Sequence, residues 1–264
     1  MSLDATQVRQ ADDHWSRWKP SEESVDRVLA ITEKVYHRTK VQVIERLLGN
    51  DFRGQTVLDY GGGVGYFAVW FAERGARSIL VDAEANALEI ARLLAKRRGV
   101  AERVQTVCAE SIPPKPPDCR YDLIIAKDVI EHLPDDRSFF AAAARCQDPG
   151  GRLLVSTQSS RSLNYLLEGT YHRKWSGERD WCGWDPTHVR FYTPRSLKAR
   201  LAEANYRPRR WWGSYIIPYN ILSWLVLLRK NIEWPGLHKL DVHLGGLLPF
   251  NRLGWTLMVL AERA

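Results

Sequence analysis

The sequence predicts an α/β fold in which helices cover both faces of a doubly wound, mostly parallel sheet. Two observations predict it. Short apolar runs typical of buried strands alternate with longer runs whose apolar residues recur at helical spacing. Three glycines, at 61–63, also stand where the first such strand meets the first helix. This alternation favours a parallel sheet, because parallel strands are joined by crossover helices that pack on its faces.

The expected elements follow one another with short connections. Strands are expected at residues 55–60, 78–81, 104–108, 122–126, 151–156, 209–212 and 255–261. Helices are expected at 64–74, 85–98 and 136–146, with a proline-rich loop at 111–120 and a turn at 148–150. A further helix is expected to follow the N-cap Thr193, to have Pro194 as its first residue and to stop near Asn205.

The 264 residues are expected to form one compact domain with three parts. Residues 1–50 carry amphipathic helical runs and are expected to form an N-terminal helical cap, before a cofactor-binding core at 51–157. Residues 158–264 contain a polar, aromatic and irregular segment at 158–190, the last strands, and an apolar and basic insertion at 213–252. The irregular segment is expected to be an inserted lid over a substrate, with a loop packed on the sheet as the alternative.

The net charge of +7 favours anionic partners in general. Nucleic acid is disfavoured, because no block of Lys and Arg is interleaved with aromatic residues. The insertion at 213–252 joins an apolar run to Arg229 and Lys230, which suits an anionic membrane surface or a lipid-like acceptor. A helical subdomain that closes the pocket or forms a dimer interface is the alternative, and the sequence predicts no oligomeric state.

The four cysteines have neither Cys-x-x-Cys nor zinc-binding spacing, which predicts free, mostly buried thiols in a reducing compartment. The N-terminal stretch is polar and predicts no signal peptide. The longest apolar run, 215–228, is too short to span a bilayer. We therefore expect a cytoplasmic protein, with peripheral membrane contact left open.

The glycine turn restricts the ligand. The Gly-x-x-x-x-Gly-Lys-Ser/Thr pattern of a triphosphate-binding loop is absent. A dinucleotide-binding loop fits residues 63–68, with Asp82 about 20 residues further on. Two residues count against a dinucleotide: Tyr66 stands where the third glycine would be, and the Asp59 carboxylate beside the turn would repel a pyrophosphate.

Asp59 instead suits a ligand that carries an ammonium and a sulfonium and no phosphate, and S-adenosylmethionine is such a ligand. Gly61 and Gly63 would let the backbone approach it closely, and the helix N-terminus would face its carboxylate. Asp59 would bind the ammonium directly or through water. Asp82, at the end of the second strand, would accept both ribose hydroxyls, with capping of the next helix as its alternative role.

The motifs VLDYGGGVGYF, LVDAE, YDLIIAKDVIEHLPD and DPGGRLLVSTQ occur in this order and resemble the successive motifs of class I S-adenosylmethionine-dependent methyltransferases. The resemblance implies the Rossmann-like methyltransferase fold, with a seven-stranded sheet, an antiparallel last strand and adenine contacts near residues 108–111. Lys127 and Asp128 are expected to contact the cofactor through their backbone. The whole predicted cofactor-binding set is Asp59, Gly61, Gly63, Gly65, Tyr66, Asp82, Ala83, Ala109, Glu110, Lys127 and Asp128.

Two further stretches, HWSRW and WDPTHVRFYTPRSL, are similar to the polyprenyl-quinol O-methyltransferase branch. This resemblance implies O-methylation of a hydrophobic small molecule such as a quinol, a lipid or a lipid-linked glycan, with S-adenosyl-L-homocysteine as the second product. N- or O-methylation of a soluble metabolite or sugar stays open. An NAD-binding oxidoreductase and a non-catalytic cofactor-binding module also stay open.

Two histidines are candidates for the general base that a hydroxyl acceptor needs. His132 ends the run Asp-Val-Ile-Glu-His after the fourth strand, at the sheet edge where ligands bind in α/β folds. Similar methyltransferases often use a histidine there as base, and substrate contact and a structural role are its alternatives. His188, in Asp-Pro-Thr-His, is the second candidate. The spacing of Glu131, His132 and His188 fits no standard metal motif, so no metal is predicted.

Overall fold

The structure, a computed structural model, describes residues 18–113, 120–181, 183, 185, 187–217 and 235–264. Its centre is a seven-stranded sheet in the order β3-β2-β1-β4-β5-β7-β6. The strands are β1 (Thr56–Tyr60), β2 (Arg77–Asp82), β3 (Val104–Cys108), β4 (Leu123–Lys127), β5 (Arg152–Gln158), β6 (Tyr206–Ser214) and β7 (Thr256–Arg263). Strands β1 to β5 pair in parallel, and β7 runs antiparallel between β5 and β6. The predicted seven-stranded, mostly parallel sheet is therefore confirmed.

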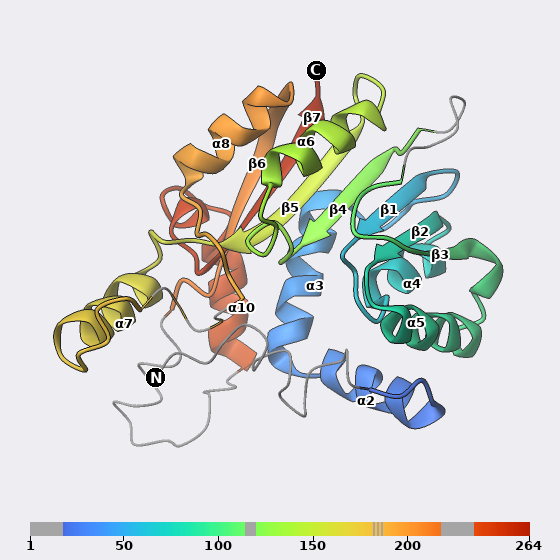
Figure 1. Cartoon of the computed structure of the whole chain (residues 1–264), viewed down its shortest axis with the longest axis horizontal. Coiled ribbons are helices and arrows are strands. Elements are labelled where there is room, and N and C mark those ends of the chain that lie inside the picture. The colour runs from blue at the N-terminus through green and yellow to red at the C-terminus, as the bar shows by residue number, and fades with distance from the viewer. Residues whose placement is uncertain (1–17, 114–119, 182, 184, 186, 218–234) are drawn as a thin grey trace.

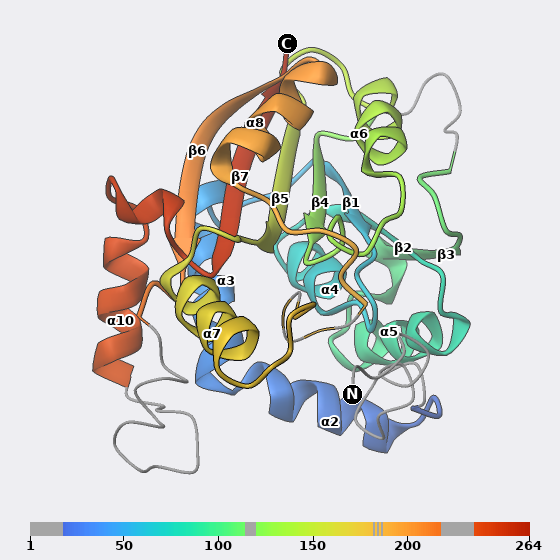
Figure 2. The same ribbon diagram turned by 60° about the vertical axis from the view of Figure 1, so that its left-hand side comes forward.

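Helices cover both faces of this sheet (Figures 1 and 2). The α-helices are α2 (Glu22–Thr32), α3 (Val35–Leu48), α4 (Tyr66–Glu73), α5 (Ala85–Arg97), α6 (Asp136–Arg145), α7 (Leu163–Lys174), α8 (Pro194–Glu203) and α10 (Pro235–Leu244), and the short 3-10 helices are η2 (Ala101–Arg103) and η3 (Phe250–Arg252). Neighbouring strand residues point to opposite faces: Ile124 joins the core that includes α6 and α8, and Ile125 joins the core that includes α3, α4 and α10. The doubly wound arrangement follows from this alternation.

Strand β6 is longer than the predicted 209–212, because Pro208 does not end it. Proline cannot donate a ladder hydrogen bond, so the prediction started the strand after it. The structure places β6 at the edge of the sheet, with an irregular register between Pro208 and Arg210 opposite β7. An edge strand with a bulge tolerates proline, so the strand continues through it.

The prediction of an irregular segment at 158–190 is wrong for α7. Ser162 is the N-cap of this helix, and its side chain accepts a hydrogen bond from the backbone N–H of Tyr165. The helix buries only Asn164 and Gly169, so its sequence lacks the apolar face toward the core that indicates a helix. Helices α2 and α7 both lie beyond the carboxyl ends of β1, β4 and β5 (Figure 1).

Other predicted features are found where the described residues include them. Thr193 caps α8 in a reciprocal capping box, Pro194 opens the helix, and Asn205 follows its end with a positive φ of 59°. Of the cysteines, Cys108 and Cys146 are free; Cys146 is buried, but Cys108 is exposed, against the expectation of mostly buried thiols. Cys119 and Cys182 lie outside the described residues, as do residues 218–234 of the predicted insertion. Within the described residues, no helix has the length and apolar character needed to cross a membrane.

Candidate active site

The glycine turn connects β1 to α4 at the carboxyl edge of the sheet. Gly61, Gly63 and Gly65 have positive φ angles of 66°, 56° and 74°. A Cβ on Gly61 would lie 2.7 Å from Val129 Cγ2, and a Cβ on Gly62 would lie 2.4 Å from the Oδ2 of Asp59. The backbone therefore passes so close to its neighbours that a side chain would displace the turn. Gly62, which the predicted site set omits, is as tightly enclosed as Gly61 and Gly65.

Two aspartates hold this turn in place. The backbone N–H of Ala68 donates to Asp59 Oδ2 at 3.0 Å, and that of Gly63 donates to Asp82 Oδ2 at 2.8 Å. The Oδ1 of Asp82 accepts from Glu84 N at 2.9 Å, and Glu84, not Asp82, is the N-cap of α5. A carboxylate can accept about four hydrogen bonds. Asp82 therefore has acceptor capacity left for two ribose hydroxyls.

The Asp59 carboxyl is 2% exposed, and burial raises its pKa to about 7. A nearby ammonium stabilises the ionised form of a carboxyl. Asp59 is therefore suited to a cationic ligand group, although one of its oxygens already binds the start of α4. The closed glycine turn, the aspartate beside it and the spare acceptors of Asp82 fit S-adenosylmethionine.

The predicted adenine side lies where β2 and β3 end together. Cys108 pairs with Asp82 in the parallel register, and Ala109 N donates to the carbonyl of Asp82 at 3.0 Å. The hydroxyl of Tyr60 donates to the Glu110 carbonyl at 2.7 Å, and the Cys108 thiol lies 3.5 Å from the Ala83 carbonyl. The predicted residues of β2, β3 and their following loops are thus brought to one corner of the sheet.

A partly buried ion pair at the end of β4 was not predicted. The ammonium of Lys40, on α3, lies 2.5 Å from Asp128 Oδ2, and the Lys127 ammonium lies 3.0 Å from the same oxygen. Burial favours the neutral forms, but the lysine charges outweigh it and hold the pKa of Asp128 well below its usual range. Ser156 Oγ donates to the other oxygen at 2.6 Å. Asp128 is therefore ionised, and its side chain fixes the loop that follows β4.

Helix α3 also covers the start of α4. The ring of His37 packs edge-on against Tyr66 at 4.4 Å and stacks on Phe67 at 5.7 Å between ring centroids. Burial, then the charges of Lys127 and Lys40, lower the pKa of His37 to about 4, so the ring is neutral. Tyr66, a predicted cofactor residue, thus stands between the glycine turn and the N-terminal helices.

His132 is oriented by a short chain of hydrogen bonds. Its Nδ1 lies 2.9 Å from Thr187 Oγ1, which lies 2.6 Å from Asp185 Oδ1. Burial opposes ionisation of Asp185, but the hydrogen bonds from Thr187 hold the pKa of this carboxyl below its usual value. The ionised carboxylate only accepts, so Thr187 donates to it and accepts from Nδ1–H of His132. In a neutral His132 ring the proton is then on Nδ1, and Nε2 carries the lone pair.

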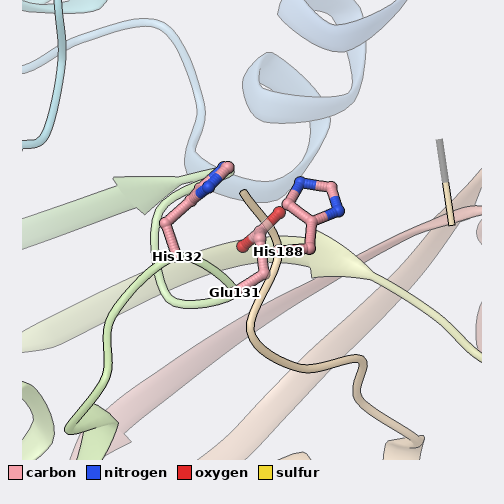
Figure 3. Close-up of side chains that lie close together, drawn as sticks. All are labelled: Glu131, His132 and His188. Carbon is pink, nitrogen blue, oxygen red and sulfur yellow. The ribbon is translucent and has the colours of Figure 1, made fainter. Parts of the chain in front are cut away.

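Glu131 and His188 complete this cluster, as Figure 3 shows. The ring centroids of His132 and His188 are 4.6 Å apart. Glu131 is fully buried, and burial followed by the charge of Asp128 raises its pKa to about 8. Burial and then His132 lower the pKa of His188 to about 4. At neutral pH the cluster therefore holds a protonated Glu131 and a neutral His188.

Glu131, His132 and His188 are also residue types that can bind a metal ion. One potential ligand atom from each lies within 4.8 Å of the others. The fold thus gathers three potential metal ligands whose spacing in the sequence fits no standard metal motif.

The segment that carries Thr187 and His188 is fastened to the loop after β4. Val189 N donates to the Glu131 carbonyl at 2.9 Å, and the Arg190 guanidinium donates to the Leu133 carbonyl. The hydroxyl of Tyr192 donates to Asp136 Oδ2 at 2.7 Å. These hydrogen bonds therefore hold the segment of His188 against the loop that carries His132, next to the glycine turn.

A glycine turn after β1, an acidic residue ending β2 and a loop of candidate bases after β4 define a class I S-adenosylmethionine-dependent methyltransferase. The sequence matches the methyltransferase domain family over residues 32–210, and the chain belongs to this family. S-adenosylmethionine is therefore its cofactor, as predicted.

Curated relatives and solved structures are similar to this chain over different shares of its length. A ubiquinone biosynthesis O-methyltransferase of Aeromonas salmonicida is 33% identical over 57% of this chain, and the match spans 62% of that relative. One of Aliivibrio fischeri is 27% identical over 88% of this chain and 94% of the relative. The structure of a geranyl diphosphate C-methyltransferase from Streptomyces coelicolor with S-adenosyl-L-homocysteine is 15% identical, covers 86% of this chain and 79% of that chain, and has a TM-score of 0.56. This structural likeness confirms the fold.

Proposed function

We propose that the protein transfers a methyl group from S-adenosylmethionine to a hydroxyl oxygen of a hydrophobic small molecule, such as a quinol or a lipid. The orientation of His132 by Thr187 carries this proposal. It directs an unprotonated Nε2 away from the Thr187 contact, on a loop whose Val129 touches the glycine turn. The curated relatives named ubiquinone biosynthesis O-methyltransferase support an oxygen acceptor.

The bound cofactor supplies an electrophilic methyl group on a sulfonium. The residues of this chain position the acceptor and remove its proton. His132 Nε2 takes the hydroxyl proton as the oxygen attacks, and the imidazolium that forms is stabilised through Thr187 by the Asp185 carboxylate. General-base assistance of this kind contributes about 10²- to 10⁴-fold to the rate.

We assign His188 to acceptor contact rather than to the base. Its Nε2 lies 3.7 Å from Asp185 Oδ2, longer than a hydrogen bond, and its Nδ1 is buried without a hydrogen-bond partner among the described residues. A buried nitrogen of this kind gains from a polar group on the ligand. Glu131, protonated at neutral pH, lies in the same cluster and offers a donor to an acceptor oxygen.

The exposed apolar residues of α7 support a hydrophobic acceptor taken from a membrane surface. Leu163, Leu166, Leu167 and Tyr171 of this helix are exposed, and Trp175, which follows it, is 80% exposed. Tyr165, on another side of the helix, packs against Trp181 and Phe191 instead. Exposed apolar residues on a chain of net charge +7 suit an anionic lipid surface. We therefore place the membrane contact on α7.

A methyl-transfer assay with an acceptor panel tests the proposed function. The panel holds a prenylated catechol, its water-soluble analogue without the tail, and an amine of similar size. With labelled S-adenosylmethionine we expect O-methylated prenylated catechol as the main product. Methylation of the amine alone, or preference for the water-soluble analogue, would assign the protein to the soluble-acceptor alternative.

A further inference from the structure

A cavity of about 330 Å³ lies apart from the glycine turn, on the flank of the sheet formed by β5, β7 and β6. It is bounded by the turn after β5, the first turn of α8 and the end of η3. Its lining residues are Arg161, Pro194, Arg195, Lys198, Arg252 and Leu253. Four of these six are cations, and none is acidic.

In the described part of the chain, the four cations of the cavity have no acidic partner. Within the described residues, the structure shows no ion pair and no side-chain hydrogen bond for any of the four. Arg200, two residues after Lys198 on α8, pairs with both Asp136 and Glu203. No carboxylate among the lining residues therefore balances the four cations.

Arg252 is the most constrained of the four. Its guanidinium stacks over the Trp211 ring at 4.3 Å from the centroid, and its Nε is buried without a hydrogen-bond partner in the described residues. Burial lowers the pKa of this side chain. A buried N–H without a hydrogen-bond partner is unfavourable, and an anion in the cavity would remove that penalty. The positive end of the α8 dipole, at Pro194, adds to the same field.

We propose that this cavity binds a phosphate-bearing ligand, as a phosphomonoester, a diphosphate or a phospholipid headgroup. Guanidinium groups match phosphate oxygens with paired hydrogen bonds, and three arginines with one lysine balance a multiply charged group. The volume is sufficient for a phosphate or diphosphate. This site is additional to methyl transfer, because the glycine turn and the histidine cluster lie at the ends of β1 and β4 instead.

Two different probes distinguish a soluble phosphate ligand from a lipid headgroup. Pyrophosphate, titrated by calorimetry at low salt, reports a soluble ligand. Vesicles of phosphatidylcholine with phosphatidic acid, compared with phosphatidylcholine alone, report a lipid headgroup. The lipid source is structurally feasible because α7 begins two residues after Arg161 and exposes Leu163.

Charge-removing variants decide whether the cavity is responsible. We expect Lys198→Gln and Arg252→Gln each to weaken binding of the responding probe about tenfold. Lys96→Gln, which removes the same charge from an exposed position on α5, should leave it unchanged. Because Lys198 is exposed, its variant keeps the test valid if Arg252→Gln fails to fold. The proposal is overturned if neither probe binds the wild-type protein, or if the Lys198 and Lys96 variants bind alike.

Discussion

The hydroxyl of Thr187 lies 2.9 Å from Nδ1 of His132, across 55 residues of sequence. This contact determines which ring nitrogen of a neutral His132 carries the proton. With Asp185 ionised, Thr187 donates to the carboxylate and accepts from Nδ1–H, so a neutral His132 has its lone pair on Nε2. The arrangement orients the ring without placing a formal charge directly against it.

Replacing Thr187 tests this orientation. Thr187→Val removes the hydroxyl at nearly constant volume, so we expect kcat to fall about tenfold or more with the dissociation constant of S-adenosylmethionine unchanged. Thr187→Ser keeps the hydroxyl and should restore most of the rate. The measurement is steady-state methyl transfer together with a calorimetric titration of the cofactor. Equal rates for the valine and serine variants would show that the hydrogen bond does not orient the base.

The raised pKa of Glu131 predicts a pH-dependent stability. Its folded-state pKa is about 8, and its unfolded value is roughly 4.3. Between these values the folded chain holds a proton that the unfolded chain has released. The free energy of unfolding of the wild type, relative to Glu131→Gln, should therefore fall as pH rises, by at most about 1.4 kcal/mol per pH unit. Denaturant unfolding of both proteins across this window measures the difference, and a flat difference would contradict a buried, protonated Glu131.

The close packing of the glycine turn predicts a large effect at Gly62. A Cβ there would meet Asp59 Oδ2 at 2.4 Å and Leu80 Cδ1 at 2.6 Å, so Gly62→Ala should destabilise the fold by about 1–3 kcal/mol and abolish cofactor binding. Gly236→Ala, on α10 with no atom within 4 Å of the new Cβ, is the matched control and should bind the cofactor normally. Thermal unfolding and calorimetry report both quantities. Normal cofactor affinity in Gly62→Ala would move the cofactor away from this turn.

The exposed apolar residues of α7 predict binding to anionic vesicles. Leu166→Ser and Leu167→Ser, at exposed positions, should each weaken co-sedimentation about tenfold and leave methylation of a water-soluble acceptor intact. Leu240→Ser, at a similarly exposed leucine of α10, serves as control. Undiminished co-sedimentation of the α7 variants, or none for the wild type at low salt, would contradict a membrane contact through this helix.

The sheet could be predicted from the sequence because the spacing of apolar residues and the turn residues between the runs indicate its strands. Each strand from β1 to β5 is a short apolar run between turn residues, and the glycines mark the first junction. Helix α7 could not be predicted in the same way, because its apolar residues lie on no single face and only Ser162 signals its start. We predicted that Pro208 would mark the start of a strand. The strand β6 instead continues through Pro208, because an edge strand tolerates proline.

The site was predictable where its residues stand next to a strand, and not where they arrive from distant segments. Asp59 and Asp82 stand at the ends of β1 and β2, and His132 lies in the loop after β4. Lys40 comes from α3, and the only sequence signal was a lysine in register with the apolar positions Val43, Ile44 and Leu47. Thr187 carried no signal by itself, because its role depends on His132 lying beside it in the fold.

The rate of methyl transfer by His132→Ala tests the central claim most directly. It is measured as labelled methyl incorporated into a phenolic acceptor, alongside the dissociation constant of S-adenosylmethionine. We predict a loss of about 10²- to 10⁴-fold in kcat with cofactor affinity unchanged. Methyl transfer at the wild-type rate by this variant would contradict the assignment of His132 as general base.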